Sequence, residues 1–198
     1  MKKLLLAFAL ALVATAYSFA QSREGTMYVM PKIGVNLSSM TDVKYSHMRA
    51  GAAFGIEAGY ELTDNFAVSG ALVYSLQGVL FNKEVGGGGI KNDYLNIPVM
   101  ANYYVLPGLA LKAGIQPGIL INSRVSNPEL LGGGDINDEE LHNTFDFSIP
   151  VGVSYEYNNF VLDARYNIGL TKCFKSEWEI GDNKNAVIQI TLGYKIGL

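Results

Sequence analysis

The chain has 198 residues, with 15 lysines and arginines against 18 aspartates and glutamates and a formal net charge of −3. That length suits one domain, and a mildly acidic chain with no basic cluster argues against nucleic acid as a partner. Cys173 is the single cysteine, which excludes an internal disulfide framework.

The N-terminus has the three parts of a secretory signal peptide. Lys2 and Lys3 form a basic start, residues 4–16 are almost wholly apolar, and small residues stand just before Gln21. The apolar run is shorter than the ~20 residues of a spanning helix, and no later run is long enough either. Any membrane residence must therefore be by strands. We expect a signal peptide at 1–20, a periplasmic linker at 21–26 and one domain at 27–198.

From residue 28 onward, apolar and polar residues alternate with a period of two, as in β-strands with one apolar and one polar face. The clearest stretch runs from Phe160 to Leu170, where Asp163 and Arg165 lie on the polar face. A strand of that length, tilted by ~40°, covers roughly 28 Å, about the thickness of a bilayer's hydrocarbon core. In chain order the eight expected strands are 28–37, 49–62, 66–77, 94–105, 109–122, 144–157, 160–170 and 186–198.

The connections between these strands alternate in length. The tight ones are 63–65, 106–108 and 158–159, and the long ones are 38–48, 78–93, 123–143 and 171–185. An even number of strands places both termini on the side of the tight turns. This asymmetry predicts an all-β fold, an eight-stranded antiparallel up-and-down transmembrane barrel with short periplasmic turns and longer extracellular loops.

A soluble eight-stranded barrel with its apolar face inward would show the same alternation. Against it, the polar face carries less charge than a solvated surface usually does. That face is also rich in glycine, which suits the crowded lumen of a narrow barrel: Gly34, Gly51, Gly55, Gly59, Gly114, Gly118, Gly152, Gly169 and Gly193. Aromatic residues on the apolar face gather beside the tight turns and predict a membrane-interface girdle: Tyr60, Phe66, Tyr103, Tyr155, Tyr157, Phe160 and Tyr194.

Pointing the polar faces inward predicts a charge network in the lumen, with five charges of each sign. Since an unpaired buried charge is costly, we expect a paired plug; the alternative is a narrow ion path through the network. Asp163 and Arg165, two residues apart on one face, are the first candidates for cross-strand pairing. The full set is Lys32, Arg49, Glu57, Glu61, Lys112, Asp146, Glu156, Asp163, Arg165 and Lys195.

Other candidate sites are weaker. The glycine run 86–89 lacks the following Lys-Ser/Thr of a phosphate cradle, and the acidic segment 132–140 lacks the spacing of a calcium-binding EF-hand. His47 and His142 have no accompanying serine motif for nucleophilic chemistry, and no charged triad surrounds Cys173, which we expect to be a passive residue in an external loop. We therefore expect no catalytic residues, no cofactor and no metal.

Several segments, in order, resemble the small PorT-family, porin-like outer-membrane barrels of Bacteroidota. They are Tyr94-Leu95-Asn96-Ile97-Pro98-Val99, Gly114-Ile115-Gln116-Pro117-Gly118, Phe145-Asp146-Phe147, Val151-Gly152-Val153-Ser154-Tyr155, the stretch 162–170 and the closing Leu192-Gly193-Tyr194-Lys195. The resemblance implies an eight-stranded barrel in the outer membrane. A shared fold does not transfer the secretion role of the protein that names the family.

We expect a non-enzymatic, monomeric outer-membrane protein whose external loops serve surface structure or binding. Its expected partners are outer-membrane lipid and lipopolysaccharide, with an envelope protein or extracellular ligand at loops 123–143 and 171–185. The alternatives are a narrow porin-like channel for ions or small solutes and a lipid-processing outer-membrane enzyme.

Overall fold

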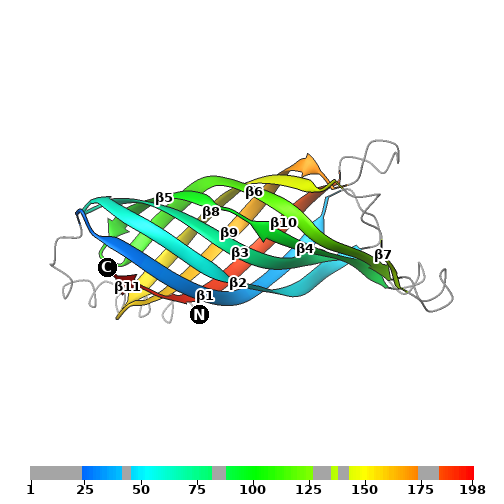
Figure 1. Cartoon of the computed structure of the whole chain (residues 1–198), viewed down its shortest axis with the longest axis horizontal. Helices are drawn as coiled ribbons and strands as arrows, with labels where there is room; N and C mark the ends of the chain where they lie inside the picture. The colour runs from blue at the N-terminus through cyan, green and yellow to red at the C-terminus, as the bar shows by residue number, and fades with distance from the viewer. Residues whose placement is uncertain (1–23, 42–45, 82–87, 127–134, 138–142, 174–182) are drawn as a thin grey trace, which may run out of the picture.

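The computed structural model describes residues 24–41, 46–81, 88–126, 135–137, 143–173 and 183–198. Over these residues the chain forms a closed, antiparallel, up-and-down ring of eight wall strands, which confirms the predicted fold class (Figure 1). The same residues contain no helix long and apolar enough to cross a membrane.

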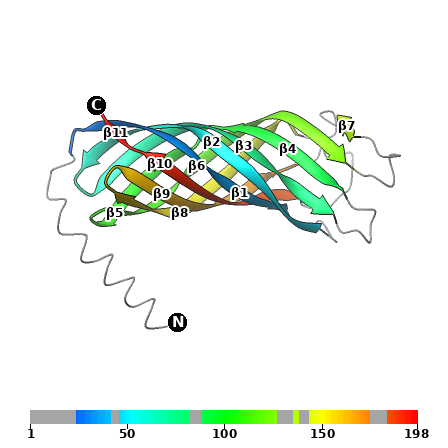
Figure 2. The same cartoon turned by 90° about the horizontal axis from the view of Figure 1, so that it is seen from below.

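Two of the eight wall strands are each interrupted once. β4 and β5 are halves of one strand separated at Ile97 and Pro98, and β10 and β11 are separated at Lys195. The pairing of β10 with β1 closes the ring, while β7 pairs with β6 alone (Figure 2). The bounds are β1 (Met27–Met40), β2 (Ser46–Thr63), β3 (Phe66–Phe81), β4 (Gly89–Asn96), β5 (Val99–Leu106), β6 (Leu109–Ser126), β7 (Asp135–Asn137), β8 (Phe145–Tyr157), β9 (Phe160–Lys172), β10 (Lys184–Tyr194) and β11 (Ile196–Gly197).

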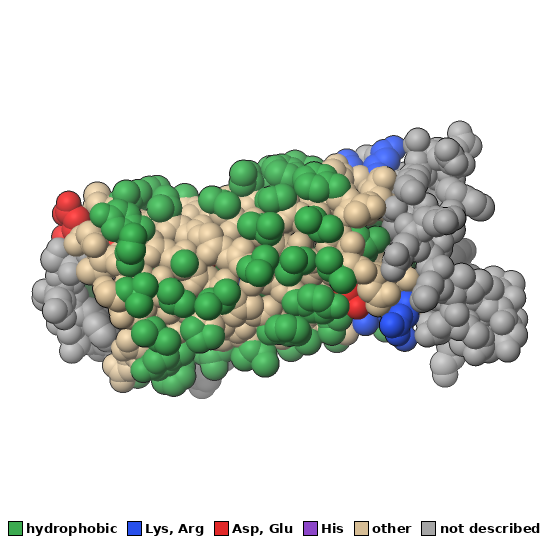
Figure 3. Space-filling model, in the orientation of Figure 1, with side chains coloured by type: hydrophobic (Ala, Val, Ile, Leu, Met, Phe, Trp, Pro, Cys, Tyr) green, Lys and Arg blue, Asp and Glu red, His purple; other side chains and the backbone are tan. Residues whose placement is uncertain are grey.

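The apolar face of the wall points outward and the polar face points into the lumen. In β9, Leu162 is 52% exposed, whereas its neighbour Asp163 is 1% exposed. In β1, Ile33 is exposed and Lys32 is buried. Hydrophobic side chains accordingly cover the middle of the outer surface (Figure 3). This arrangement excludes the soluble barrel, because that fold would bury the apolar face.

The three tight turns lie at one end of the ring and follow from local residue chemistry. Between β8 and β9, Asn158 and Asn159 both have positive φ, 46° and 70°. Two consecutive positive φ values are those of a type I′ turn, whose twist matches that of a hairpin. Between β5 and β6, Gly108 takes φ 79°. The turns therefore return the chain to the neighbouring strand with almost no loop.

At the opposite end the wall extends further than the alternation predicts. β3 continues to Phe81 rather than ending at Gln77, and β4 begins at Gly89 rather than at Tyr94. Val79 keeps the inward phase of Ser75 and Gln77 but is apolar, as is the inward Ile90 of β4. In the pairing of β4 with β6, Asn122 lies opposite Asp93 and Leu120 opposite Tyr94, so Ile121 is skipped. Because apolar residues at inward positions and such a bulge both remove the alternation of polar and apolar residues, segments predicted as loop are part of the wall.

Candidate functional site

The lumen changes character along the barrel, and β1 passes through all three of its layers. From the tight-turn end onward, the inward side chains of β1 include Lys32, then Asn36 and finally Met40, and all three are buried. The layers are a charged network, an amide and hydroxyl middle, and an apolar layer towards the long loops.

The charged network is centred on Glu57 of β2. The Lys32 ammonium donates to Glu57 Oε2, and Lys112 Nζ lies 3.6 Å from Glu57 Oε1. Lys112 Nζ also donates to Asp163 Oδ2 at 2.6 Å, and Arg165 Nε lies 3.3 Å from Asp163 Oδ1. Each of these side chains is at most 4% exposed. Four strands of the ring, β1, β2, β6 and β9, are thus joined by charge.

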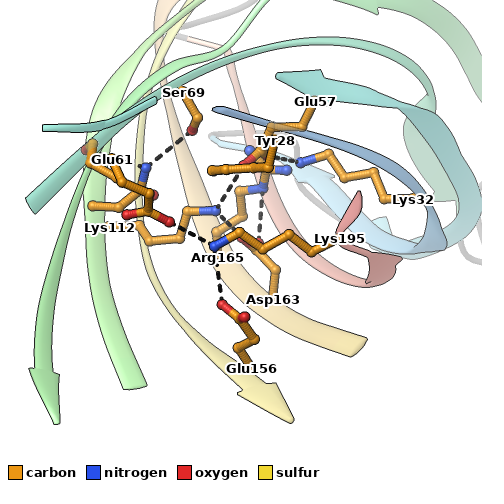
Figure 4. Close-up of polar contacts among 12 residues, drawn as sticks. Tyr28, Lys32, Glu57, Glu61, Ser69, Lys112, Glu156, Asp163, Arg165 and Lys195 are labelled. Atoms are coloured by element: carbon orange, nitrogen blue, oxygen red, sulfur yellow. Dashed lines mark hydrogen bonds and ion pairs between the residues drawn. The ribbon is translucent and has the colours of Figure 1, made fainter. Parts of the chain in front are cut away.

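A second group of charges lies nearer the tight turns. Lys195 Nζ donates to Glu61 Oε1 at 2.6 Å and to Glu156 Oε2 at 3.2 Å. Tyr28 joins the two groups, because its hydroxyl donates to Glu57 Oε1 at 3.2 Å while its ring lies 4.3 Å from Lys195 Nζ (Figure 4). A cavity of about 20 Å³ between them has room for about one water. The charged layer therefore fills the cross-section of the barrel almost completely.

Of the ten charged residues named from the sequence, eight meet in this network. Arg49 and Asp146 lie apart from it, towards the long loops: Arg49 is half-buried and donates to the carbonyl of Gln77, and Asp146 accepts hydrogen bonds from Thr171 and Asn185. They lie apart because β2 and β8 place them near the loop end of the wall.

The cross-strand pairing expected for Asp163 and Arg165 is present for Asp163, whereas the ion-pair partner of Arg165 lies on its own strand. The two contact each other within β9, and the cross-strand partner of Asp163 is Lys112 of β6. Within the described residues, no nitrogen of the Arg165 guanidinium has a hydrogen-bond partner.

Two tyrosines of the network were missed from the sequence. Tyr28 is buried in the lumen, and the Tyr104 hydroxyl donates to Glu61 Oε1 at 3.2 Å. The period of two carries the signal that would have found them, because each lies one residue away from an outward apolar position.

The middle layer is built from amides and hydroxyls. Asn36 Nδ2 and Gln77 Nε2 both donate to Ser75 Oγ, at 2.9 and 3.0 Å. On the opposite side, Gln116 Nε2 donates to Ser148 Oγ at 3.1 Å. The Asn36 bond joins β1 to β3, the Gln116 bond joins β6 to β8, and Gln77 and Ser75 both belong to β3. None of these side chains carries a formal charge.

The layer towards the long loops is apolar. Met40, Val79, Ile90 and Cys173 pack together inside the barrel, with Phe81 against them. Cys173 follows the last residue of β9, within the predicted connection 171–185, but its side chain is 2% exposed and belongs to this cluster, so its external position is corrected. Val79 reaches the cluster at the regular inward position that follows Ser75 and Gln77 on β3.

We expect the Cys173 thiol to react slowly in the folded barrel. Burial, aided by the nearby Asp146 carboxylate, raises the pKa of this thiol to about 12, and the thiolate is the reactive form. At pH 8 alkylation by iodoacetamide should be at least ~100-fold slower than in urea-unfolded protein, as followed by mass spectrometry. Equal alkylation rates in the folded and unfolded states would show that the Cys173 thiol is accessible and that its pKa is not raised.

The seven aromatic residues named as a girdle lie beside the tight turns. Phe66 pairs with Tyr103 across β3 and β5, and Tyr157 pairs with Phe160 across β8 and β9. The Phe160 ring meets Tyr194 edge to face at 5.1 Å. Tyr60, like most of the set, is more than a third exposed. Their outward position is compatible with a membrane interface, which stays a prediction.

The weaker candidates remain separate from the lumen. His47 is exposed near the loop end of β2, whereas His142 and most of the acidic segment 132–140 lie outside the described residues, as does the beginning of the glycine run 86–89. The described part of the chain contains no group of three or more His, Cys, Asp or Glu side chains that could hold a metal ion.

An eight-stranded ring with an apolar outside, a charged and filled inside, and tight turns at one end defines a class of protein, the small outer-membrane β-barrels. The chain belongs to the outer membrane protein beta-barrel domain family, whose model matches residues 19–175. The protein is therefore an outer-membrane protein. No curated protein matches the chain significantly.

Solved structures of similar fold come from several bacteria. Neisserial surface protein A shares 18% identity with a TM-score of 0.55, over 87% of this chain and 100% of that one. The attachment invasion locus protein Ail of Yersinia pestis shares 17% with a TM-score of 0.50, over 87% and 99%. OprG of Pseudomonas aeruginosa shares 14% with a TM-score of 0.51, over 88% and 97%. At these identities the likeness concerns the fold.

Proposed function

We propose that this outer-membrane barrel is a closed, non-enzymatic scaffold that holds its long loops at the cell surface for structure or binding. The observation that carries the proposal is the filling of the lumen at two levels. Near the tight turns, Glu57 and Lys112 belong to a dense ion-pair network. Towards the loops, Met40, Val79 and Ile90 pack into an apolar layer. An ion crossing the barrel would have to break the ion-pair network and lose its hydration shell in the apolar layer.

The loops 123–143 and 171–185 are the proposed contact regions for an envelope protein or an extracellular ligand. Two of the proteins of similar fold are named as a surface protein and as an attachment invasion locus protein. The second has also been solved in complex with the heparin analogue sucrose octasulfate. These names support a surface role for a barrel of this shape.

The runner-up is a narrow channel, and Arg165 is the observation that favours it. Its guanidinium is 3% exposed and has no hydrogen-bond partner within the described residues. Gln189, directly opposite on β10, likewise has an unpaired Nε2 there. Buried donors of this kind are usually hydrated, and a hydrated patch in mid-lumen is one element of an ion path.

We expect no steady current through the purified wild-type barrel in planar lipid bilayers, because the two closed layers lie in series. Arg165→Gln should be equally silent, since it leaves the apolar layer intact. Steady current through the wild type, with an ion selectivity that changes in Arg165→Gln, would overturn the closed scaffold in favour of the channel. Lys172→Gln, at the rim, is the control for a change in surface charge alone.

The lipid-processing enzyme has the least support. A nucleophile needs an adjacent base, and the one described histidine, His47, is exposed at the loop end of β2. Cys173, the single thiol, is buried in the apolar layer.

We further infer the finer features that the sequence suggests. Residues 1–20 are a signal peptide, 21–26 a periplasmic linker and 27–198 the barrel, and the protein is a monomer. The segments that resemble the PorT family support a porin-like, Bacteroidota-type member of the barrel family. Outer-membrane lipid and lipopolysaccharide are the proposed surroundings of the apolar belt.

A further inference from the structure

Two basic side chains face each other on the outer wall at the loop end of the barrel. Lys91 of β4 and Arg124 of β6 are directly opposite in the antiparallel register, and both are exposed. Neither side chain forms an ion pair or a hydrogen bond to another described residue. Like charges directly opposite each other destabilise a sheet. Their juxtaposition is therefore unfavourable unless an anion lies between them.

The residues next to this pair place it at the edge of the apolar belt. One row closer to the tight turns, Asp93 lies opposite Asn122 and accepts hydrogen bonds from Asn122 Nδ2 at 3.1 Å and the Tyr74 hydroxyl at 3.3 Å. Asp93 is thus occupied by neutral donors and forms no ion pair with either Lys91 or Arg124.

Beyond that polar row the surface becomes apolar. Ile119 and Ile121 of β6 are exposed, and Phe54 stacks on Tyr74 at 5.3 Å. The step from Lys91 to the next outward apolar position on its strand, Leu95, covers only ~13 Å along the strand. The two cations therefore lie at the depth of lipid headgroups, at the loop end where Lys and Arg side chains border the hydrophobic belt (Figure 3).

We propose that Lys91 and Arg124 form a clamp for the phosphate of a phosphorylated glycolipid in the outer leaflet. The proposal rests on the orientation given under the proposed function, with the long loops outside. A guanidinium binds phosphate oxygens in bidentate fashion and an ammonium adds a point charge. The bound phosphate turns one repulsive contact into two attractive ones.

The direction of the side chains favours a lipid over a soluble anion. Side chains stand roughly perpendicular to a sheet, so Lys91 and Arg124 point sideways from the wall, towards neighbouring lipids. Their nearest polar row, with Asp93, already adjoins the apolar belt. A phosphate attached to acyl chains in that belt reaches the clamp without leaving the bilayer.

The test is lipid retention by the full-length barrel, measured by native mass spectrometry after release from mixed micelles. The probes are lipid A with both phosphates, the same lipid after dephosphorylation, and phosphatidylglycerol. For wild type we expect retention of the phosphorylated lipid A above both others. Lys91→Gln with Arg124→Gln should weaken that retention by about tenfold or more, and Lys91→Arg should preserve it.

A matched control exists on the other side of the rim. Lys172 of β9 and Lys184 of β10 are also directly opposite each other, but both have further interactions within the chain. Lys172→Gln with Lys184→Gln removes the same charge and should leave most of the retention. Equal loss in the two double variants would overturn the clamp, because it would reveal an effect of net charge alone.

Three other results would also overturn the proposal: retention of dephosphorylated lipid A as strong as that of the phosphorylated form, equal retention of phosphatidylglycerol, and full retention by the Lys91→Gln, Arg124→Gln variant. Folding is checked separately by the gel mobility of unheated samples, which both double variants should keep because Lys91, Arg124 and Lys172 are exposed and Lys184 is only partly buried. Failure of the clamp leaves the closed scaffold standing, since the scaffold is tested by conductance.

Discussion

Replacing Glu57 with leucine should lower the free energy of unfolding by about 3–5 kcal/mol, the usual effect of removing one partner from a buried ion pair. Lys32 and Lys112, whose side chains are 1% and 4% exposed, both lie against this carboxylate. Without it, they and Arg165 share the single carboxylate of Asp163. The substitution also removes the Glu57 oxygen that accepts the Tyr28 hydroxyl bond. The Tyr28 ring is then less firmly held in its contact with the Lys195 ammonium.

The measurement is equilibrium urea unfolding of the barrel refolded into phospholipid vesicles, followed by the mobility of unheated samples in gels. Glu57→Gln keeps the shape and one hydrogen-bonding oxygen and should fall between wild type and Glu57→Leu. Glu156→Gln is the matched control, because the Glu156 side chain is 17% exposed and a more hydrated pair contributes less. A Glu57→Leu barrel within about 1 kcal/mol of wild type would contradict the network as a major source of stability.

Gly34→Ala should lower the free energy of unfolding about as much as Glu57→Leu, although it adds a single methyl group. A Cβ at Gly34 would lie 2.0 Å from the Ile190 carbonyl oxygen and 2.6 Å from the Thr191 Cα. Both are backbone atoms of β10, and the β1 to β10 pairing is the one that closes the ring. Because neither backbone atom can rotate away, the clash is relieved only if β1 and β10 move apart. We therefore expect the free energy of unfolding to fall by about 3 kcal/mol or more.

Gly70→Ala is the matched control for this substitution. Gly70 points outward from β3, and a Cβ there would meet no atom within 4 Å. We expect no loss, and a gain of up to about 1 kcal/mol from the smaller conformational freedom of the unfolded chain. The same urea titration measures both variants. Equal stability of the two alanine variants would show that the pairing of β1 with β10 tolerates an extra methyl group.

Much of the wall could be predicted from single residues and their spacing. The stretch 160–170 was expected as a strand and lies within β9, Phe160–Lys172, with Leu162 outside and Asp163 inside. The tight turn at Asn158 and Asn159 was also expected. These predictions succeed because alternation and turn chemistry are local properties, set by neighbours in the chain.

The ends of the strands were less predictable. Residues 38–40 and 78–81 were expected in loops and lie in β1 and β3. Val79 keeps the inward phase of Ser75 and Gln77, but it is apolar, as are the inward Met40 of β1 and Ile90 of β4. The apolar layer, including Cys173, therefore lies where inward and outward residues no longer differ in polarity, and this removes the signal by which the sequence marks a strand.

By itself the sequence determined which residues face the lumen and which face the bilayer, because that choice depends only on position within an alternating strand. The tertiary structure alone decided which of the lumen charges touch. Lys112 meets both Glu57 and Asp163, three residues from three separate strands of the ring. Such contacts follow from the tilt and stagger of the closed barrel, which bring distant strands to the same height only when the ring is complete.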